Sequence, residues 1–277
     1  MQIIRYAAFT TDPAGGNPAG IVLDATGVTD ADMQAAAADV GYSESAFLIP
    51  RVDGDLDVRY FSPLAEVPFC GHATVAASVA HAAAHGSGPL RLHTRVGLVQ
   101  VSTTETDSGF TATLVSVPPR TADIPVDLRD RLLATLRWSA DDLDDALPVR
   151  AAYAGAWHPV IAARSRARLA ALDYDYPALA ALMAEQDWTT IQLVHRESDV
   201  VVHSRNPFPP GGVVEDPATG AAAAALGGYL RELGLISLPA ALTIHQGDDM
   251  GRPGVITVAI PSDLGSGIHV TGTAVPI

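Results

Sequence analysis

The chain has 277 residues, of which 48% are hydrophobic and 17% are charged, and this composition excludes an intrinsically disordered protein. The formal net charge of −14 argues against nucleic acid or an anionic membrane surface as a partner. A single cysteine excludes an internal disulfide and any metal site built from several cysteines.

The N-terminal segment and the hydropathy of the chain bear on its location. Residues 1–6 (MQIIRY) lack the apolar stretch that a signal peptide requires. No run of about 18 strongly apolar residues is present, so we expect no transmembrane helix. The sequence therefore predicts a cytoplasmic protein without a membrane partner.

The first half of the chain alternates short strands with two helices. Residues 30–39 predict a helix that stops near Gly41, and an alanine-rich helix follows Thr74 and ends at Gly86. Strands are expected at residues 1–8, 20–24, 46–50, 55–61, 90–94, 98–104 and 109–116.

The second half begins after a domain boundary at Pro118 and Pro119. Helices are expected at 129–138, 177–186 and 221–233, the last with Gly234 as its C-terminal cap. Many short strands around one central helix per half predict an α+β fold with strongly curved sheets. The length indicates two domains, 1–118 and 119–277, and this division is compatible with a last strand that packs back on the N-terminal domain.

One type of motif occurs twice, each time before an alanine-rich helix: CGHAT at 70–74 and DPATG at 216–220. Aligning Cys70 with Asp216, and Pro63 with Pro207, extends the similarity into the flanking strands and indicates two related domains. A helix N-terminus attracts anions, so each motif predicts an anion site beside a group capable of acid–base chemistry.

Five motifs in a fixed order make the chain recognisable. They are GNPAG (16–20), SESAF (43–47), FSP (61–63), CGHAT (70–74) and EDPATG (215–220). On these motifs the chain resembles the phenazine-biosynthesis PhzF-like isomerase family and, more distantly, diaminopimelate epimerase and proline racemase. The resemblance implies two pseudo-symmetric epimerase-like domains, each a curved sheet or barrel wrapped around a central helix, with the active site between them. It also implies a homodimer that needs no metal or organic cofactor.

The resemblance also assigns roles to residues of these motifs. The family's proton-shuttling glutamate corresponds to Glu44, its Gly-His histidine to His72 and its Asp-Pro aspartate to Asp216. The backbone near the two helix starts is expected to hold a substrate carboxylate. The substrate-binding candidates are Asn17, Ser43, Gly71, Ala73, Thr219, Gly220 and Ala221.

The chain departs from the patterns of its relatives at Cys70. Racemases of the wider fold use two thiols, one from each domain, whereas the second motif here offers Asp216, so a two-thiol racemase is excluded. The phenazine enzyme has a non-thiol residue at the position of Cys70, and Ala73 and Ala221 replace a proline and a serine. A thiol at a helix N-terminus is expected to be reactive, which makes Cys70 a further catalytic candidate.

Each catalytic candidate has a purely structural interpretation as well. Glu44 lies among small and apolar residues, a setting that suits a proton acceptor, but a surface glutamate at a strand start has the same sequence signature. Asp216 fits an ordinary helix N-cap, His72 a buried core histidine, and Cys70 a small buried apolar residue.

Two further patterns suggest a metal or phosphate site only weakly. His81 and His85 are spaced as a zinc-binding pair, yet no third ligand accompanies them, and histidine is favoured near a helix C-terminus in any case. Gly15 and Gly16 lack the lysine and the glycine spacing of a P-loop. We expect no metal site, and a turn that positions Asn17.

The leading hypothesis is a cofactor-independent isomerase of the dihydro-hydroxyanthranilate type, which moves a proton within a small anionic carboxylic or amino acid. Glu44 is the expected base, and the substrate needs a delocalised π-system because a carboxylate cannot deprotonate an ordinary alkyl group. The first alternative is an epimerase-like enzyme that uses Cys70 and Asp216. The second is a non-catalytic member of the fold that binds a small molecule or a protein.

Overall fold

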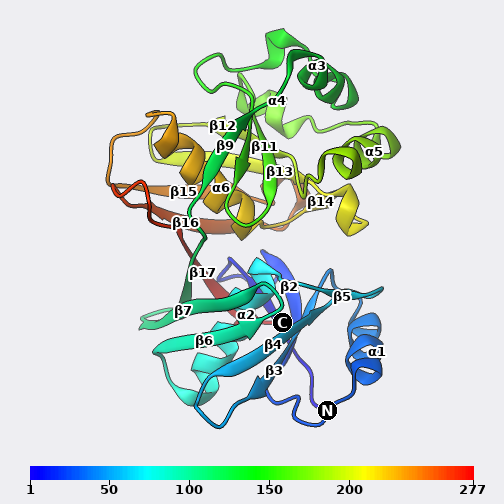
Figure 1. Ribbon diagram of the computed structural model, residues 1–277, viewed down its shortest axis with the longest axis vertical. Helices are drawn as coiled ribbons and strands as arrows, with labels where there is room; N and C mark the ends of the chain where they lie inside the picture. The colour runs from blue at the N-terminus through cyan, green and yellow to red at the C-terminus, as the bar shows by residue number, and fades with distance from the viewer. The chain divides into compact units, whose positions relative to one another are not determined.

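The computed structural model describes residues 1–277 and divides the chain into two compact units (Figure 1). The first unit consists of Met1–Val115 and Thr271–Ile277, and the second of Ser116–Val270. The C-terminal segment therefore belongs to the first unit. None of the helices combines the length and the apolar character that crossing a membrane requires.

The first unit contains two helices and most of the strands that surround them. The helices are α1 (Asp30–Val40) and α2 (Gly71–His85). The strands are β1 (Ile4–Ala8), β2 (Asn17–Val22), β3 (Ser45–Pro50), β4 (Leu56–Phe61), β5 (Glu66–Val67), β6 (Pro89–Thr94), β7 (Gly97–Thr106), β8 (Gly109–Val115) and β17 (His269–Pro276).

Eight strands of the first unit close into a barrel. Going round the barrel, the order is β1, β2, β3, β4, β6, β7, β8 and β17, and β17 pairs again with β1. The pairs β2–β3 and β4–β6 are parallel, while β1–β2, β3–β4, β6–β7, β7–β8 and β17–β1 are antiparallel. Closure leaves none of these eight strands with an unpaired edge.

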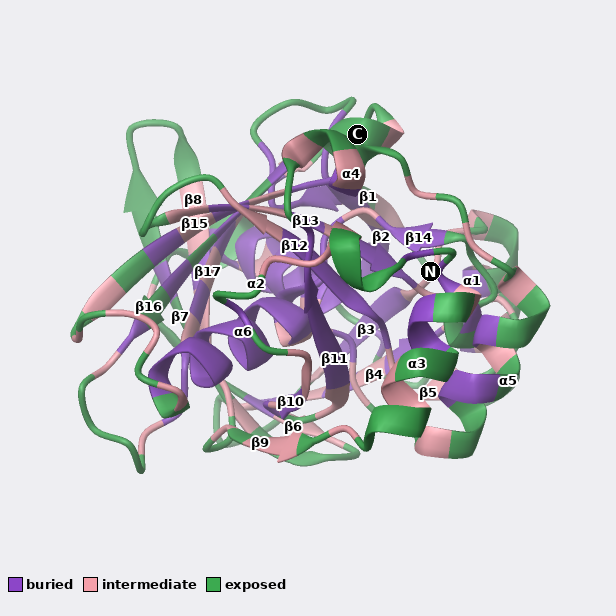
Figure 2. Ribbon diagram, turned by 90° about the horizontal axis from the view of Figure 1, so that it is seen from above, coloured by how far each residue is buried: buried purple, intermediate pink, exposed green.

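Helix α2 forms the core of this barrel. Its sequence is mostly alanine, valine and serine, and every residue from His72 to Ala80 is buried (Figure 2). A helix that is buried on all sides must be narrow and apolar all round, which explains the alanine run. It packs against β1, β2, β3, β7 and β8 and ends where Gly86 takes a φ of 96°.

The second unit has helices on the outside as well as in its core. The helices are α3 (Val126–Thr135), α4 (Arg166–Ala170), α5 (Tyr176–Gln186) and α6 (Gly220–Glu232), with short 3₁₀ turns at Ala140–Asp142, Pro209–Gly211 and Asp248–Met250. The strands are β9 (Arg120–Asp123), β10 (Arg150–Tyr153), β11 (Trp157–Ala162), β12 (Gln192–Arg196), β13 (Val201–Pro207), β14 (Glu215–Asp216), β15 (Ala240–Gln246) and β16 (Gly254–Ile260).

Helix α6 is the counterpart of α2 in the second unit. The surrounding sheet runs in the order β9, β10, β11, β12, β13, β15 and β16, and α6 packs against β9, β10, β11 and β16. All residues of α6 from Ala222 to Arg231 are buried (Figure 2). After α6, Gly234 takes a φ of 65° and donates to Arg231, and Leu235 donates to Leu230, which is the predicted glycine cap in the form of a Schellman motif.

Outside the barrel of the first unit and the sheet of the second, helices cover apolar side chains. In the second unit α3, α4 and α5 contribute Leu132, Leu169 and Leu179 to one buried cluster with strand residues such as Leu193.

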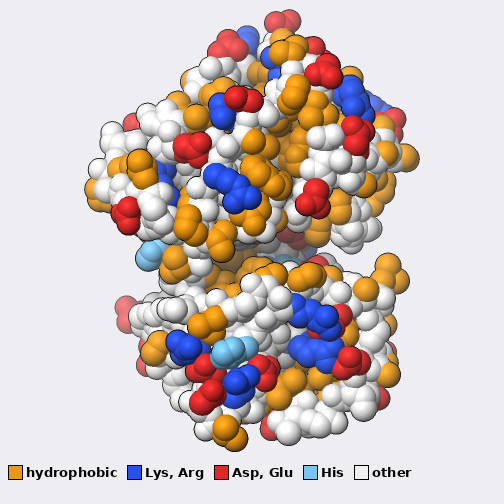
Figure 3. Space-filling model, in the orientation of Figure 1, with side chains coloured by type: hydrophobic (Ala, Val, Ile, Leu, Met, Phe, Trp, Pro, Cys, Tyr) orange, Lys and Arg blue, Asp and Glu red, His pale blue; other side chains and the backbone are white.

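On the exposed surface, acidic and basic side chains lie interspersed, as Figure 3 shows for one face. Many of them form ion pairs, so the net negative charge is not concentrated in one uniform patch on that face.

The two units repeat one topology, which supports the predicted duplication. The parallel pairs β2–β3 and β4–β6 have counterparts in β11–β12 and β13–β15. Each unit also has a two-stranded pairing just before its central helix, β4–β5 and β13–β14. An arginine joins the strands by a bidentate pair: Arg59 donates to Glu66 over 2.9 and 2.7 Å, and Arg205 donates to Glu215 over 2.9 and 2.5 Å.

This repeat corrects the alignment made from the sequence. Glu66 and Glu215 occupy equivalent places, and the helices begin the same number of residues later, at Gly71 and Gly220. Cys70 is therefore equivalent to Thr219, three residues beyond Asp216. The alignment of Pro63 with Pro207 is likewise wrong by two residues. Pro207 pairs with Glu215 as Phe61 pairs with Glu66, so Pro207 is equivalent to Phe61. The sequence alignment was wrong because the loops before α2 and α6 contain similar residue types at positions that are not equivalent in the structure.

The predicted elements were otherwise close to those observed. Helix α1 is capped by Gly41 in the left-handed region, as expected from the glycine after a helical run. Strand β2 starts at Asn17 rather than at residue 20, so it includes Pro18. Proline is common in turns, but here Pro18 pairs with Ala7 of β1. Helix α3 begins and ends three residues earlier than predicted, because Pro125 sets its start.

Candidate functional site

In the first unit, two separate segments bring the candidate catalytic residues together. Glu44 directly precedes β3, and Cys70 is the N-cap of α2, with His72 in the first turn. Strands β2 and β3 run parallel, with Gly20 paired to Ser45, and both strands pack against α2. Glu44, just before β3, thereby contacts Cys70 at the start of the helix, although the two residues are more than twenty positions apart in the sequence.

Glu44, Cys70 and His72 form a compact cluster. The Cys70 thiol donates to Glu44, with 3.5 Å between Sγ and Oε2, and Sγ lies 3.3 Å from Nδ1 of His72. Nε2 of His72 lies 3.6 Å from Oε2 of Glu44. The side chains of Glu44 and His72 are 13% and 6% exposed. An acid, a thiol and an imidazole thus share one nearly buried site, where a proton can pass between them over short distances.

Ser43 extends this cluster, and the helix start adds backbone donors. The hydroxyl of Ser43 lies 3.5 Å from Nε2 of His72. Gly71 and Ala73 belong to the first turn of α2, where backbone N–H groups have no partner within the helix. Together these groups are suited to bind an anionic substituent beside a proton-transfer group.

A buried hydroxyl chain fixes the backbone of Cys70. Thr74 donates from Oγ1 to the carbonyl oxygen of Cys70 over 2.6 Å, and Tyr60 lies 2.7 Å from the same hydroxyl. Burial raises the pKa of Tyr60 far above its usual value, so the phenol stays protonated. This support could not be predicted from the sequence, because Tyr60 has the pattern of an ordinary core residue of β4.

The second motif forms a separate polar network in the second unit. Asp216 belongs to β14, and its Oδ2 accepts a hydrogen bond from Oγ1 of Thr219 over 2.6 Å. The N-cap of α6 is Thr219, so the structural interpretation of Asp216 as the cap residue is wrong. The aspartate instead accepts from the hydroxyl of the cap residue. Gly220 and Ala221 form the first turn of α6.

Gln246 was not foreseen from the sequence, and it holds this second motif in place. Its amide donates to the carbonyl of Asp216 over 2.8 Å and to the hydroxyl of Thr219 over 2.9 Å. Its own carbonyl oxygen accepts from the backbone N–H of Thr219 over 3.1 Å. The side chain is 1% exposed. No local pattern marks it, because it lies at the end of β15, far from the motif in sequence.

Asn17 lies at the start of β2, after a glycine turn. Gly16 has a φ of 57°, and a Cβ there would lie 2.2 Å from the carbonyl oxygen of Ala8, so only glycine fits. This agrees with a turn that places Asn17, which is 1% exposed, rather than with a phosphate loop. Asn17 is in the same unit as the Glu44 cluster, on a strand that packs against α2.

The histidine pair of α2 lacks the ligands of a metal site. The rings of His81 and His85 lie 4.6 Å apart, and burial, helped by the neighbouring ring, lowers the pKa of His81. No further histidine, cysteine or carboxylate joins them. Only Glu44, Cys70 and His72 bring three potential ligand atoms within 4.8 Å of one another.

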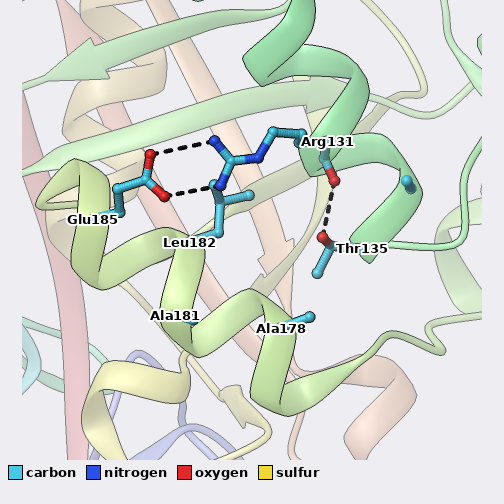
Figure 4. A pocket seen from close by; sticks show the side chains of 7 residues that line it. Arg131, Thr135, Ala178, Ala181, Leu182 and Glu185 are labelled. Atoms are coloured by element: carbon cyan, nitrogen blue, oxygen red, sulfur yellow. Dashed lines mark hydrogen bonds and ion pairs between the residues drawn. The ribbon is translucent and has the colours of Figure 1, made fainter.

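A groove between α3 and α5 has no catalytic character. Its walls include Ala178, Ala181 and Leu182, and the bidentate pair from Arg131 to Glu185 crosses it at 2.8 and 3.2 Å (Figure 4). The charged groups of this groove satisfy each other. None of the motif residues lines it.

Comparisons with known proteins agree with the fold and the motifs. The isomerase YfhB of Bacillus subtilis, which is described as uncharacterized, is 30% identical over 284 residues, covering 99% of this chain and 96% of that protein. A trans-2,3-dihydro-3-hydroxyanthranilate isomerase of Pseudomonas chlororaphis is 31% identical over 253 residues, covering 90% and 86% of the two chains.

Solved structures show the same architecture. A phenazine biosynthesis protein of the PhzF family from Bacillus anthracis matches with a TM-score of 0.89 and 27% identity, covering 100% of this chain and 98% of the other. A probable proline racemase from Agrobacterium radiobacter shares the fold at a TM-score of 0.69 and 12% identity, covering 99% and 90%.

A family model described as "phenazine biosynthesis-like protein" matches residues 6–277, nearly the whole chain. The relatives from Bacillus subtilis and Pseudomonas chlororaphis carry the name isomerase, in agreement with the acid–base cluster at the start of α2. The chain belongs to the phenazine biosynthesis-like family and is an isomerase.

Proposed function

We propose that the enzyme isomerises a small carboxylic or amino acid by moving a proton between two carbons of a delocalised system, without a cofactor. The observation that carries this proposal is the Glu44 carboxylate, nearly buried and in contact with both Cys70 and His72 at a helix start. The named activity of the relatives from Pseudomonas, isomerisation of trans-2,3-dihydro-3-hydroxyanthranilate, supports the substrate class.

In this proposal Glu44 removes a proton from carbon and returns it elsewhere on the same face of the substrate. The negative charge that develops is delocalised over the substrate, and His72 and Ser43 donate hydrogen bonds that stabilise it. The amides of Gly71 to Ala73 hold the substrate carboxylate, assisted by the dipole of α2. Asp216 and the amides of Gly220 and Ala221 are a second set of groups for polar substituents. Gln246 fixes this set through its hydrogen bonds to the carbonyl of Asp216 and the N–H of Thr219.

Incorporation of solvent deuterium tests the reaction. Candidate substrates, including trans-2,3-dihydro-3-hydroxyanthranilate, are incubated with the enzyme in D₂O, and the position of deuterium is read by NMR. We expect a product with a shifted double bond and deuterium only at the carbon that receives the proton. The Glu44→Gln variant should lose this reaction, and Glu105→Gln, which neutralises an exposed carboxylate in β7, is the matched control.

An epimerase-like reaction is the second candidate, and the contact between Cys70 and His72 favours it. An imidazole 3.3 Å from a thiol can take its proton and leave a thiolate, which is a capable base. In that reaction Cys70 acts on an α-carbon together with Asp216, and the product differs from the substrate only in configuration. Chiral analysis of the recovered substrate distinguishes inversion from a shifted double bond.

We also propose, from the family resemblance, that the enzyme is a cytoplasmic homodimer. Light scattering of the purified protein measures the mass in solution directly. A mass of one 28.8 kDa chain would contradict the dimer.

A further inference from the structure

We propose that Glu44, Cys70 and His72 bind one zinc-class divalent ion, and that this ion inhibits the isomerase. The binding part of this proposal depends only on the three side chains. The inhibition part rests on the proposed function of Glu44 as the base. In the proposed reaction Glu44 acts without a metal, so the ion is proposed as an inhibitor and not as a cofactor.

The distances within the cluster match the edges of a zinc coordination tetrahedron. A tetrahedral ion with Zn–S of about 2.3 Å and Zn–N or Zn–O of about 2.0–2.1 Å keeps its ligand atoms about 3.3–3.6 Å apart. Sγ of Cys70 and Oε2 of Glu44 are 3.5 Å apart, and Nε2 of His72 is 3.6 Å from Oε2 and 3.9 Å from Sγ. The three separations are thus within a few tenths of an ångström of these edges. Because Sγ lies nearer to Nδ1 of His72, at 3.3 Å, the imidazole must also turn about its side-chain bonds to direct the Nε2 lone pair at the ion.

The chemistry of the ligands selects the type of ion. A thiolate and an imidazole favour zinc and similar transition metals, whereas magnesium and calcium prefer sites made of oxygen alone. Three protein ligands leave a fourth position open, so the ion can bind without rearrangement of the fold. The hydroxyl chain from Tyr60 through Thr74 to the carbonyl of Cys70 fixes the backbone of one ligand residue in advance.

Metal binding and catalysis are mutually exclusive at this site. A carboxylate whose lone pair is donated to zinc no longer accepts a proton from carbon, and the ion occupies the space beside the helix start. Inhibition should therefore be competitive with substrate. It should follow the occupancy of the metal site.

Titration of the full chain with Co²⁺, in the presence of a phosphine reductant, tests binding without any assay of activity. A cobalt–thiolate bond gives an intense charge-transfer band in the near ultraviolet, and Cys70 is the only thiol in the chain. We expect this band to saturate at one ion per chain and to vanish when Zn²⁺ is added. The Cys70→Ser variant should lose the band, and Glu44→Gln should weaken Zn²⁺ binding at least about tenfold, as expected from loss of a ligand.

The control variant is His85→Ala. It removes the exposed member of the histidine pair His81 and His85 on α2, which lies outside the proposed metal site. It should bind Co²⁺ as the unmodified chain does. Three results would each overturn the metal site. The first is cobalt binding without the band, and the second is a band that is equally strong in Glu44→Gln at the same metal concentrations. The third is loss of the band in His85→Ala.

Inhibition is measured separately, as the rate with Zn²⁺ divided by the rate of the same variant without metal. We expect the unmodified enzyme to be inhibited in step with the cobalt band, and Cys70→Ser to need at least about tenfold more Zn²⁺ for the same fractional loss. A saturated metal site in a fully active enzyme would overturn the inhibition and leave the binding intact. Failure to find isomerase activity would count against the proposed function alone, since the cobalt titration does not depend on it.

Discussion

The thiol of Cys70 donates a hydrogen bond to the carboxylate of Glu44, with 3.5 Å between Sγ and Oε2. These are the two residues proposed as alternative proton acceptors, and the structure shows that they are direct neighbours. A change at either one alters the surroundings of the other. Their roles are therefore separated by the relative severity of two substitutions and not by one substitution alone.

Replacing Glu44 with glutamine should abolish most of the activity. The amide keeps the shape of the side chain but cannot take a proton, and loss of a general base typically lowers the rate about 10²–10⁴-fold. Turnover is measured on an authentic substrate, and circular dichroism checks the fold. The Glu105→Gln control should keep the normal rate, and full activity of Glu44→Gln would refute the assignment.

Replacing Cys70 with serine should leave measurable activity. A serine hydroxyl can still donate to Glu44, and Glu44 remains available as the base. We expect a loss much smaller than that of Glu44→Gln, determined under identical conditions. Complete inactivation of Cys70→Ser, combined with an active Glu44→Gln, would favour the epimerase-like reaction instead.

An anion should bind at the start of α2 or of α6. Crystals soaked with sulfate or a small carboxylate should show density within hydrogen-bonding reach of the amides at Gly71–Ala73 or at Gly220 and Ala221, because these amides lack partners within their helices. The expected contacts are about 2.7–3.2 Å long. Crystals that show no anion at either helix start, at concentrations that saturate inhibition by the same anion, would contradict the prediction.

Acid should destabilise the second unit through His158. This side chain is fully buried, and desolvation lowers its pKa to about 4, while a hydrogen bond to Thr190 partly opposes the shift. As the pH falls from about 6.5 to 4, the unfolded chain takes up a proton that the folded chain does not, so the free energy of unfolding decreases, by about 3 kcal/mol in total.

The His158→Asn variant checks this assignment, since asparagine can still bond to Thr190 but does not titrate. Its free energy of unfolding should fall less steeply between pH 6.5 and 4 than that of the unmodified chain. The control is His85→Asn, at an exposed position, which should keep the original slope. Equal slopes for the unmodified chain and His158→Asn would show that another group is responsible.

Gln246 should prove to be a positioning residue for the second motif. Replacing it with alanine removes three hydrogen bonds and leaves the N–H of Thr219 buried without this acceptor, which should cost about 2–4 kcal/mol of stability. Urea denaturation measures the loss. A change below about 0.5 kcal/mol would mean that water or a neighbouring group replaces the amide.

Local signals in the sequence predicted the helices well, because their determinants lie within a few residues. Gly41 and Gly234 end α1 and α6 as glycine caps do, and the alanine runs correctly indicated two narrow buried helices. The closed barrel followed from the family resemblance and not from the strands themselves, since no local pattern says that β17 returns to β1.

The arrangement of the site could be predicted only in part. The motifs identified Glu44, Cys70 and His72, but not their mutual contacts, which depend on how β3 lies along α2. The equivalence of Cys70 and Asp216 was wrong, because the alignment matched residue types in the loops before α2 and α6. The true register between the two units depends on the strand pairings, which the sequence does not show. Gln246 and Tyr60 act through contacts between segments distant in sequence, which no single motif encodes.

The return of the C-terminal strand has a consequence for the order in which the protein is made. Strand β17 is synthesised after all the other strands of the fold, yet it pairs with β1 and β8 and completes the first barrel. Until then the first unit has two unpaired sheet edges, which invite association with other chains. The N-terminal part of the chain therefore stays incompletely folded while the entire second unit is synthesised. A chain truncated before residue 271 cannot complete the barrel of its first unit.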